Sequence, residues 1–405
     1  MARVIRAKVK GSVLAWARDS AGLTTQEAAR RAGTTEDKLA AWENEARAPT
    51  VGQLQKLANA YRRPLAVFYL QEPPMRFQAM RDFRRMPGDG PVAFSPELVL
   101  EIRVAHQRRQ LAMELLQESG EEIPRFELSA RLTDNPEEVG ANIRRTLGVG
   151  PAERALWRTD PAGYSAFNSW RARIEKAHAL VFQSSRITAG EVSGFAIAEE
   201  LLPAIVVSRK RTSVRRRTFS LLHELAHVML RLSGVSELDV DAARPPEEQR
   251  VEIFCNKVAA ATLMPEESVR SEPQFTGIRM ASESWTDDVI RELALEYSVS
   301  REAFVRRMQT LGYTTAAFYR RKRAQYNEEF RRRLEREREA YKRPGNEFKT
   351  NPPRDALTNF GTPLVQMILG SYYQDRMTLS DVSGYLGIRT RHIPRLEQIV
   401  GSRGR

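Results

Sequence analysis

The chain has 405 residues, of which 41% are hydrophobic and 28% are charged, and its formal net charge is +13 at pH 7. The length predicts two to four domains, no apolar run is long enough to cross a membrane, and the single cysteine excludes an internal disulfide framework. The N-terminus lacks the apolar stretch of a signal peptide, so we expect a cytoplasmic protein. The excess of basic residues predicts an acidic partner, nucleic acid first.

Residues 8–74 are predicted to form an all-α domain of about five short helices. A helix, a turn at Gly33 and a further helix over Thr35–Glu45 make a helix-turn-helix pattern. The spacing from Gly33 to Trp42 and Glu43, followed by RAPT, resembles the Xre/Cro-like repressor family. The resemblance implies that this domain binds DNA.

The helix expected to read DNA carries charges of both signs. Glu36 and Asp37 suit a helix N-terminus but repel a DNA backbone, and nearby basic side chains partly offset them. A small helical domain that binds protein is therefore the alternative. The predicted DNA-binding residues are Thr25, Thr35, Lys38 and Ala41.

Residues 75–94, rich in Met, Arg, Gly and Pro, are predicted to link this domain to a second one over 95–270. Apolar residues recur at helical spacing from Pro96 to Glu118, and two further helices are predicted around 142–148 and over 165–178. Three short runs, apolar and partly β-branched, then predict strands at Leu180–Gln183, Val192–Ala198 and Ala204–Ser208.

A run of basic residues, RKRTSVRRR at 209–217, follows the third predicted strand. Such a run is usually a solvated loop, and we favour that interpretation. The functional alternative is an electrostatic landing site for an acidic segment of a substrate.

The segment Leu221–Leu230, LLHELAHVML, combines an apolar helix with a metal-binding pattern. His223 and His227 are four residues apart, so on a helix both imidazoles face one point, and Glu224 can reach a metal-bound water. Polar side chains in an apolar helix are costly, which makes purely structural histidines the weaker explanation. The pattern predicts Zn²⁺ bound by His223 and His227, with Glu224 as general base.

A third zinc ligand must come from another segment. The metzincin extension is missing, because Leu230 and Ser233 stand in the positions of its glycine and histidine. A predicted helix over Val251–Pro265 supplies Glu252 near its start. A surface glutamate that favours a helix N-terminus is an equally good explanation of Glu252, so these residues alone leave its role open.

The two segments together resemble a known family. FSLLHELAH followed by ExxCNxxAAxxLMP is similar to the ImmA/IrrE metallopeptidases, bacterial and phage zinc proteases that relieve repression by cutting partner DNA-binding repressors. The resemblance implies that Glu252 is the third zinc ligand, although Cys255 stands where the family usually has alanine. It also implies a zincin-like domain whose edge strand, Ser193–Ile197, holds an extended substrate, with Ser193, Gly194 and Phe195 as substrate-binding residues.

Helical modules are predicted beyond Pro265. A subdomain over 271–345 includes a charged amphipathic helix at 316–341, whose basic residues are either an exposed, ion-paired surface or a nucleic-acid contact. A final helical module is predicted over 354–400. The predicted fold class is therefore mainly α and multidomain: an all-α helix-turn-helix domain, an α+β zincin-like peptidase domain with a small three-stranded sheet, and helical C-terminal modules.

The predicted function is a zinc-dependent endopeptidase with its own DNA-binding domain, which is compatible with a homodimer on DNA. The resemblance implies that it cleaves a partner repressor or antitoxin and so induces gene expression in a stress, phage or mobile-element response. One alternative is a DNA-binding regulator whose metallopeptidase-like domain is a sensor or scaffold without turnover. Another is a toxin–antitoxin or defence component. Glu224 favours the enzyme, because a scaffold needs zinc ligands but no base.

Overall fold

A computed structural model of the chain describes residues 6–74, 81–82, 94–188, 190–236, 245–341 and 351–403. The chain divides into two compact units. The first comprises residues up to 80 together with 89–104, and the second comprises 81–88 and 105–405. Helix α5 (Pro96–Ser119), which matches the helix predicted there, therefore begins in one unit and ends in the other. Most of the predicted linker over 75–94 lies outside the described residues.

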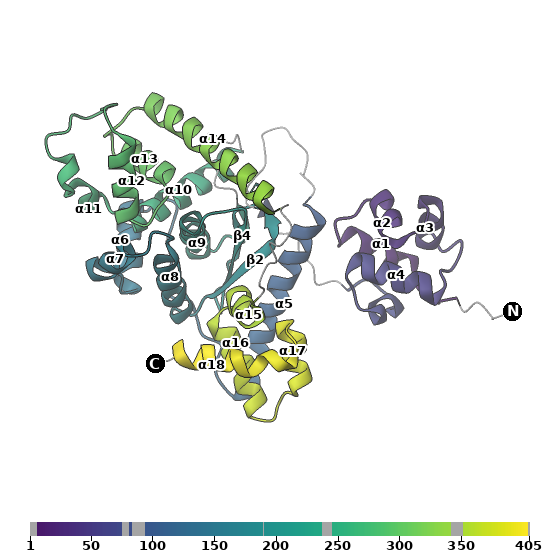
Figure 1. The fold of residues 1–405 in the computed structure, drawn as a ribbon. Coiled ribbons are helices and arrows are strands. Elements are labelled where there is room, and N and C mark those ends of the chain that lie inside the picture. The colour runs from purple at the N-terminus through teal and green to yellow at the C-terminus, as the bar shows by residue number, and fades with distance from the viewer. Residues whose placement is uncertain are drawn as a thin grey trace. The chain divides into compact units, whose positions relative to one another are not determined.

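The first unit contains the predicted helix-turn-helix domain, whose short helices surround one apolar core (Figure 1). Gly33, at φ +64°, ends the second helix in the left-handed region, and the chain enters the next helix three residues later. Leu39 and Trp42 anchor that helix in the core. The elements are α1 (Gly11–Asp19), α2 (Thr25–Ala32), α3 (Glu36–Glu43), α4 (Val51–Tyr61) and the 3-10 turn η1 (Leu65–Tyr69).

The second unit combines helices with one sheet. Before the sheet, its helices are α6 (Pro136–Thr146), α7 (Pro151–Arg158) and α8 (Tyr164–Lys176). After the first strands of the sheet come α9 (Val214–Met229), α10 (Pro246–Leu263), α11 (Glu266–Arg270), η2 (Pro273–Phe275), α12 (Asp287–Glu296), α13 (Arg301–Thr310) and α14 (Ala316–Tyr341).

The sheet has five strands in the described part of the chain, in the order β1-β5-β3-β4-β2. β2 and β4 are parallel, whereas β3 is antiparallel to both of its neighbours, β4 and β5. The three predicted strands are confirmed as β2, β3 and β4, and two short strands extend the sheet. The strands are β1 (Arg81–Asp82), β2 (Leu180–Thr188), β3 (Gly194–Ile197), β4 (Ala204–Lys210) and β5 (Gly234–Ser236).

The predicted edge position of Ser193–Ile197 is wrong. β5 follows α9 and pairs with β3, with Phe195 opposite Val235, so β3 has a hydrogen-bonded neighbour on both sides. β5 is only three residues long, which is too short a run for alternation of apolar and polar residues to predict a strand. The outermost strands among the described residues are β1 and β2.

One apolar core joins the sheet to the helices that surround α9. Ile205 and Val207 of β4 belong to the same cluster as Leu222 and Leu225 of α9. The cluster continues through α10 into α12, α13 and α14, so the helices predicted over 271–345 share a core with the peptidase region. In the described part of the chain, no helix has both the length and the apolar character that crossing a membrane requires.

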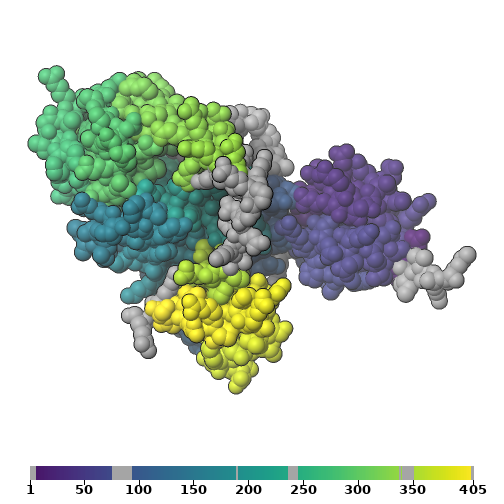
Figure 2. All heavy atoms as spheres, viewed as in Figure 1, coloured from purple at the N-terminus to yellow at the C-terminus, as the bar shows by residue number. Residues whose placement is uncertain are grey.

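The C-terminal helices form a separate lobe, yellow in Figure 2. Its first helix packs against β2, and Arg209 of β4 lies 3.3 Å from the carboxylate of Asp355. The predicted helical module over 354–400 is thus helical in the structure. Its elements are α15 (Pro352–Phe360), α16 (Thr362–Tyr373), α17 (Leu379–Leu386), η3 (Thr390–His392) and α18 (Ile393–Arg403).

Asp287, the first residue of α12, holds α14 in place. Its carboxylate accepts hydrogen bonds from Lys322 at 2.9 Å, from Gln325 at 3.1 Å and from the hydroxyl of Tyr326 at 2.8 Å. Burial alone would raise the pKa of Asp287, but these hydrogen bonds lower it to about 2. The ionised carboxylate therefore stabilises the contact between the two helices.

Asp287→Asn is expected to lower the Tm at pH 7, because the amide removes the charge that Lys322 pairs with. The contribution of the carboxylate is complete above the ordinary aspartate pKa of about 3.9 and is lost as the pH falls further, so the Tm difference from wild type shrinks below that value. Asp288→Asn is the matched control, since the Asp288 side chain is 81% exposed. Equal Tm values for the two variants at pH 7 would contradict this role of Asp287.

Candidate metal centre

Helix α9 carries the histidines and lies between the sheet and α10. The hydroxyl of Ser213 caps the helix by accepting a hydrogen bond from the N–H of Arg216 at 3.3 Å. From Ser220 to Met229 every residue is buried, because α8, the sheet and α10 all pack against this stretch. The spacing of four residues places His223 and His227 on one face, which is turned toward α10.

Three donor atoms converge between α9 and α10. Nε2 of His227 lies 3.1 Å from Oε1 of Glu252 and 3.2 Å from Nε2 of His223. Nε2 of His223 lies 3.4 Å from Oε2 of Glu252. None of the three side chains is more than 1% exposed. The structure thus brings together the three residues that the sequence predicted as zinc ligands.

This geometry fits a zinc ion. Tetrahedral zinc with bonds of about 2.0–2.2 Å places its ligand atoms roughly 3.3–3.6 Å apart. The three separations in the cluster, from 3.1 to 3.4 Å, lie at or slightly below the lower end of that range. Oε2 of Glu252 is buried and makes no hydrogen bond in the described structure, which is costly for a carboxylate unless a cation compensates it. Two imidazole nitrogens and one carboxylate oxygen are a donor set that zinc accepts.

The protonation states also suit metal binding. Burial lowers the pKa of His227, against the raising effect of Glu252, so its imidazole is neutral near pH 7. Burial alone would raise the pKa of Glu252, but His223 and His227 lower it to about 2 and keep it ionised. Neutral imidazole and ionised carboxylate are the forms that bind zinc. Burial raises the pKa of Cys255, which remains a thiol and is not among the converging donors.

Glu224 lies beside the donor cluster without belonging to it. It is fully buried, and its side chain packs against Gly194 of β3. A Cβ atom at Gly194 would lie 3.0 Å from Cγ and 3.1 Å from Oε1 of Glu224. Ser193 and Phe195, the other two residues predicted to bind substrate, are buried as well. Substrate binding by Ser193, Gly194 and Phe195 stays a prediction. Gly194 also has a structural role, because β3 approaches Glu224 closely at this position.

Asn256, for which the sequence predicts no role, also contacts the cluster. Asn256 follows Glu252 by one helical turn, and its Nδ2 donates a hydrogen bond to the backbone carbonyl of Glu252 at 2.9 Å. Its Oδ1 has no hydrogen bond, although the residue is only 8% exposed. The four-residue spacing from Glu252 is the signal in the sequence that points to Asn256.

The predicted DNA-binding residues lie on or next to α2 and α3. Thr35 caps α3, since its hydroxyl accepts a hydrogen bond from the N–H of Lys38 at 3.4 Å. Thr35 and Lys38 are exposed, whereas Thr25 and Ala41 are half-buried. Glu36 and Asp37 are exposed on the first turn of the same helix, so the mixed charge expected from the sequence is present on this surface.

Two segments of the chain match known protein families. Residues 175–309 match the IrrE N-terminal-like domain, a family of peptidases, and residues 14–68 match the helix-turn-helix family. The first match includes all three residues of the donor cluster and Glu224. No curated protein and no solved structure is found to match the chain.

Gly194→Ala is expected to destabilise the second unit by about 1–3 kcal/mol, as overpacking does in other protein cores. The added methyl group would lie 2.7 Å from the carbonyl oxygen of Val206 and 3.0 Å from Glu224. Gly384→Ala is the control, because an added Cβ there meets nothing within 4 Å. Urea unfolding measures both variants, and an unchanged midpoint for Gly194→Ala would refute the close packing of Glu224 on β3.

Proposed function

We propose that this chain is a zinc-dependent endopeptidase. It carries a helix-turn-helix DNA-binding domain, followed in the sequence by an IrrE N-terminal-like peptidase domain. The observation that carries the proposal is the convergence of His223, His227 and Glu252 within hydrogen-bonding distances, with Glu224 adjacent to His223. A structural zinc site usually has four protein ligands, whereas three ligands and a nearby carboxylate are the composition of a catalytic one.

Each residue of the centre has a role in this proposal. His223, His227 and Glu252 hold Zn²⁺, and Asn256 steadies the helical turn that presents Glu252. When bound, zinc supplies a Lewis acid that polarises a carbonyl and makes water more acidic. Glu224 accepts a proton from the attacking water as the new C–O bond forms. It then donates the proton to the amine nitrogen as the peptide C–N bond breaks.

We further propose that the substrate is a DNA-binding repressor or an antitoxin, cleaved inside the cell to induce gene expression. The helix-turn-helix domain supports this class of substrate. A peptidase tethered to DNA near a bound repressor meets it at a raised effective concentration, without any additional contact between the two proteins.

A second candidate function is a DNA-binding regulator whose metal centre is a sensor or scaffold. The burial of the centre favours it, because neither the three ligands nor Glu224 is more than 1% exposed. A metal held in this way is closed to a protein substrate unless the surrounding elements move. The two candidates differ in the role of Glu224, which a scaffold does not use.

Glu224→Gln is expected to retain zinc and to lower the rate of cleavage by about 10²–10⁴-fold, because the amide cannot accept the proton. Candidate repressors encoded near the gene are incubated with the zinc-loaded protein, and products are identified by mass spectrometry. Glu247→Gln, an exposed glutamate of α10, is the control and should cleave like wild type. Cleavage by Glu224→Gln at the wild-type rate would contradict this mechanism. If the zinc-loaded wild type cleaves none of the repressors, the scaffold function is favoured.

Lys38→Ala is expected to weaken DNA binding and to reduce the slope of log K against log salt by about 0.9, the value for one lost phosphate contact. Glu36→Gln is expected to strengthen binding, because it removes an exposed charge that repels phosphate. Fluorescence anisotropy with a labelled duplex, measured over a series of NaCl concentrations, gives both values. Lys56→Ala, on the exposed face of α4, is the control. Equal salt slopes for Lys38→Ala and wild type would place DNA on another surface.

A further inference from the structure

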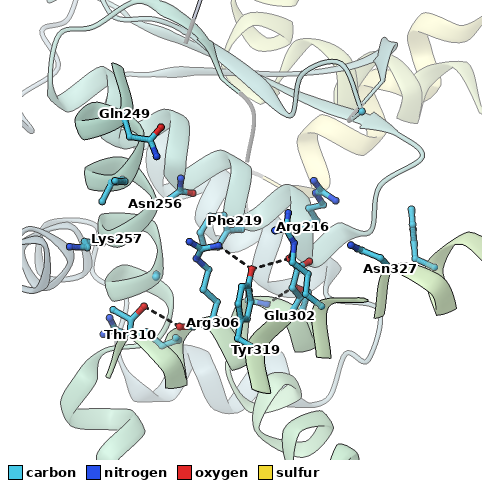
Figure 3. Close-up of a pocket in the computed structure, with 18 of the residues that line it drawn as sticks. Arg216, Phe219, Gln249, Asn256, Lys257, Glu302, Arg306, Thr310, Tyr319 and Asn327 are labelled. Carbon is cyan, nitrogen blue, oxygen red and sulfur yellow. Dashed lines mark hydrogen bonds and ion pairs between the residues drawn. The ribbon is translucent and has the colours of Figure 1, made fainter. Parts of the chain in front are cut away.

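A pocket of about 680 Å³ lies between α9 and α10 on one side and α13 and α14 on the other (Figure 3). Its volume is within the range of pockets that hold small ligands or side chains, roughly 300–1,000 Å³. Arg216 and Phe219 of α9 and Asn256 of α10 line one wall, and Arg306 and Tyr319 line the opposite one. The lining residues thus come from several separate segments of the chain, from Gly190 to Phe330.

The lining of this pocket is strongly basic. Glu302 is the carboxylate among its described lining residues, and it lies 3.5 Å from the guanidinium of Arg323. Arg307 is neutralised outside the pocket by Glu137, at 2.7 Å. Within the described structure, three exposed cations form no ion pair, so the pocket has an excess of positive charge that an acidic group would complement. These cations are Arg211, Arg216 and Lys257.

The pocket continues the face of α9 that carries the donor cluster. Arg216, Phe219 and His223 are three and four residues apart, which places them in a row along one side of the helix. On α10, Ile253 and Asn256 line the pocket directly beside Glu252. One helical turn, about 5.4 Å, therefore separates the end of the pocket from the centre, and about two residues of extended chain span that distance.

Asn256 indicates which kind of ligand the pocket takes. Its Nδ2 donates to the carbonyl of Glu252, which leaves Oδ1 as a buried acceptor without a hydrogen bond at the pocket wall. An acceptor suits a ligand that has an N–H donor as well as a negative charge. A peptide with an acidic side chain has both, whereas an inorganic anion has no N–H to donate.

We propose that this pocket binds an aspartate or glutamate side chain of the protein substrate, about two residues from the bond that is cleaved. The proposal rests on the proposed endopeptidase function. Arg216 and Lys257 attract the carboxylate, and Oδ1 of Asn256 accepts a hydrogen bond from a backbone N–H of the same segment. The basic run at 209–217 thereby gains a function through Arg211 and Arg216, which belong to the lining.

Cleavage-site profiling tests the proposal. Zinc-loaded full-length protein is incubated with a library of peptides derived from a proteome, and new termini are identified by mass spectrometry. We expect Asp and Glu to be enriched at one position close to the cut. In Arg216→Glu and Lys257→Glu, cleavage of acidic peptides should fall at least about tenfold, a loss of roughly 1.4 kcal/mol. Arg320→Glu, an exposed residue of α14 outside the lining, should leave the profile unchanged.

The results separate the two proposals. Cleavage without an acidic preference, or an unchanged profile in both pocket variants, overturns the pocket assignment while the endopeptidase stands. If the zinc-loaded protein cleaves nothing, the endopeptidase fails and the pocket is tested by binding. A fluorescent peptide with two adjacent glutamates is then titrated against its glutamine counterpart. Tighter binding of the glutamate peptide that is lost in Lys257→Glu supports the pocket, and equal binding of both peptides overturns it.

Discussion

The structure of the second unit depends on one costly constraint, the burial of two imidazoles and a carboxylate at a single point of an apolar core. His223, His227 and Glu252 lie 3.1–3.4 Å from one another and are excluded from solvent. Three polar groups in such surroundings need a shared partner, because each of them otherwise loses its hydration without compensation. The proposed zinc ion would satisfy all three at once, and its binding free energy would then contribute to the stability of the fold.

The surrounding elements are arranged to meet this constraint. α9 is covered by the sheet on one side and by α10 on the other, so Glu224 approaches β3 while the histidines face Glu252. Only a glycine fits at position 194, where Glu224 and the carbonyl of Val206 both lie within 3.0 Å of the place that a Cβ would occupy. The same helix extends its ligand face into the basic pocket, and α14, held by Asp287, forms the far wall of that pocket. Metal binding and substrate selection would therefore use adjacent turns of one helix.

Much of this arrangement could be predicted from local patterns in the sequence. The spacing of four residues predicted the paired histidines. Apolar residues at helical spacing predicted the bounds of α5 and α14 to within one residue. Glu252 required the family resemblance, because the helix predicted from Val251 placed it near a helix start, where a glutamate has a common electrostatic explanation. α10 instead begins at Pro246, and Glu247 and Glu248 are the acidic residues of its first turn. β5 was missed because three residues carry no periodicity, and its pairing with β3 refuted the edge strand. The pocket was beyond prediction, since its walls are brought together by tertiary packing alone.

The metal content of the purified protein tests the central claim most directly. After zinc-replete expression, the metal content of four proteins is measured by mass spectrometry: wild type, His223→Ala, Glu252→Ala and His392→Ala. His392→Ala is the control, because His392 lies outside the cluster. The account predicts about one zinc per chain in wild type and in His392→Ala, and a strong loss of zinc in the other two variants. Zinc that persists in both His223→Ala and Glu252→Ala, or that is absent from wild type, would contradict it.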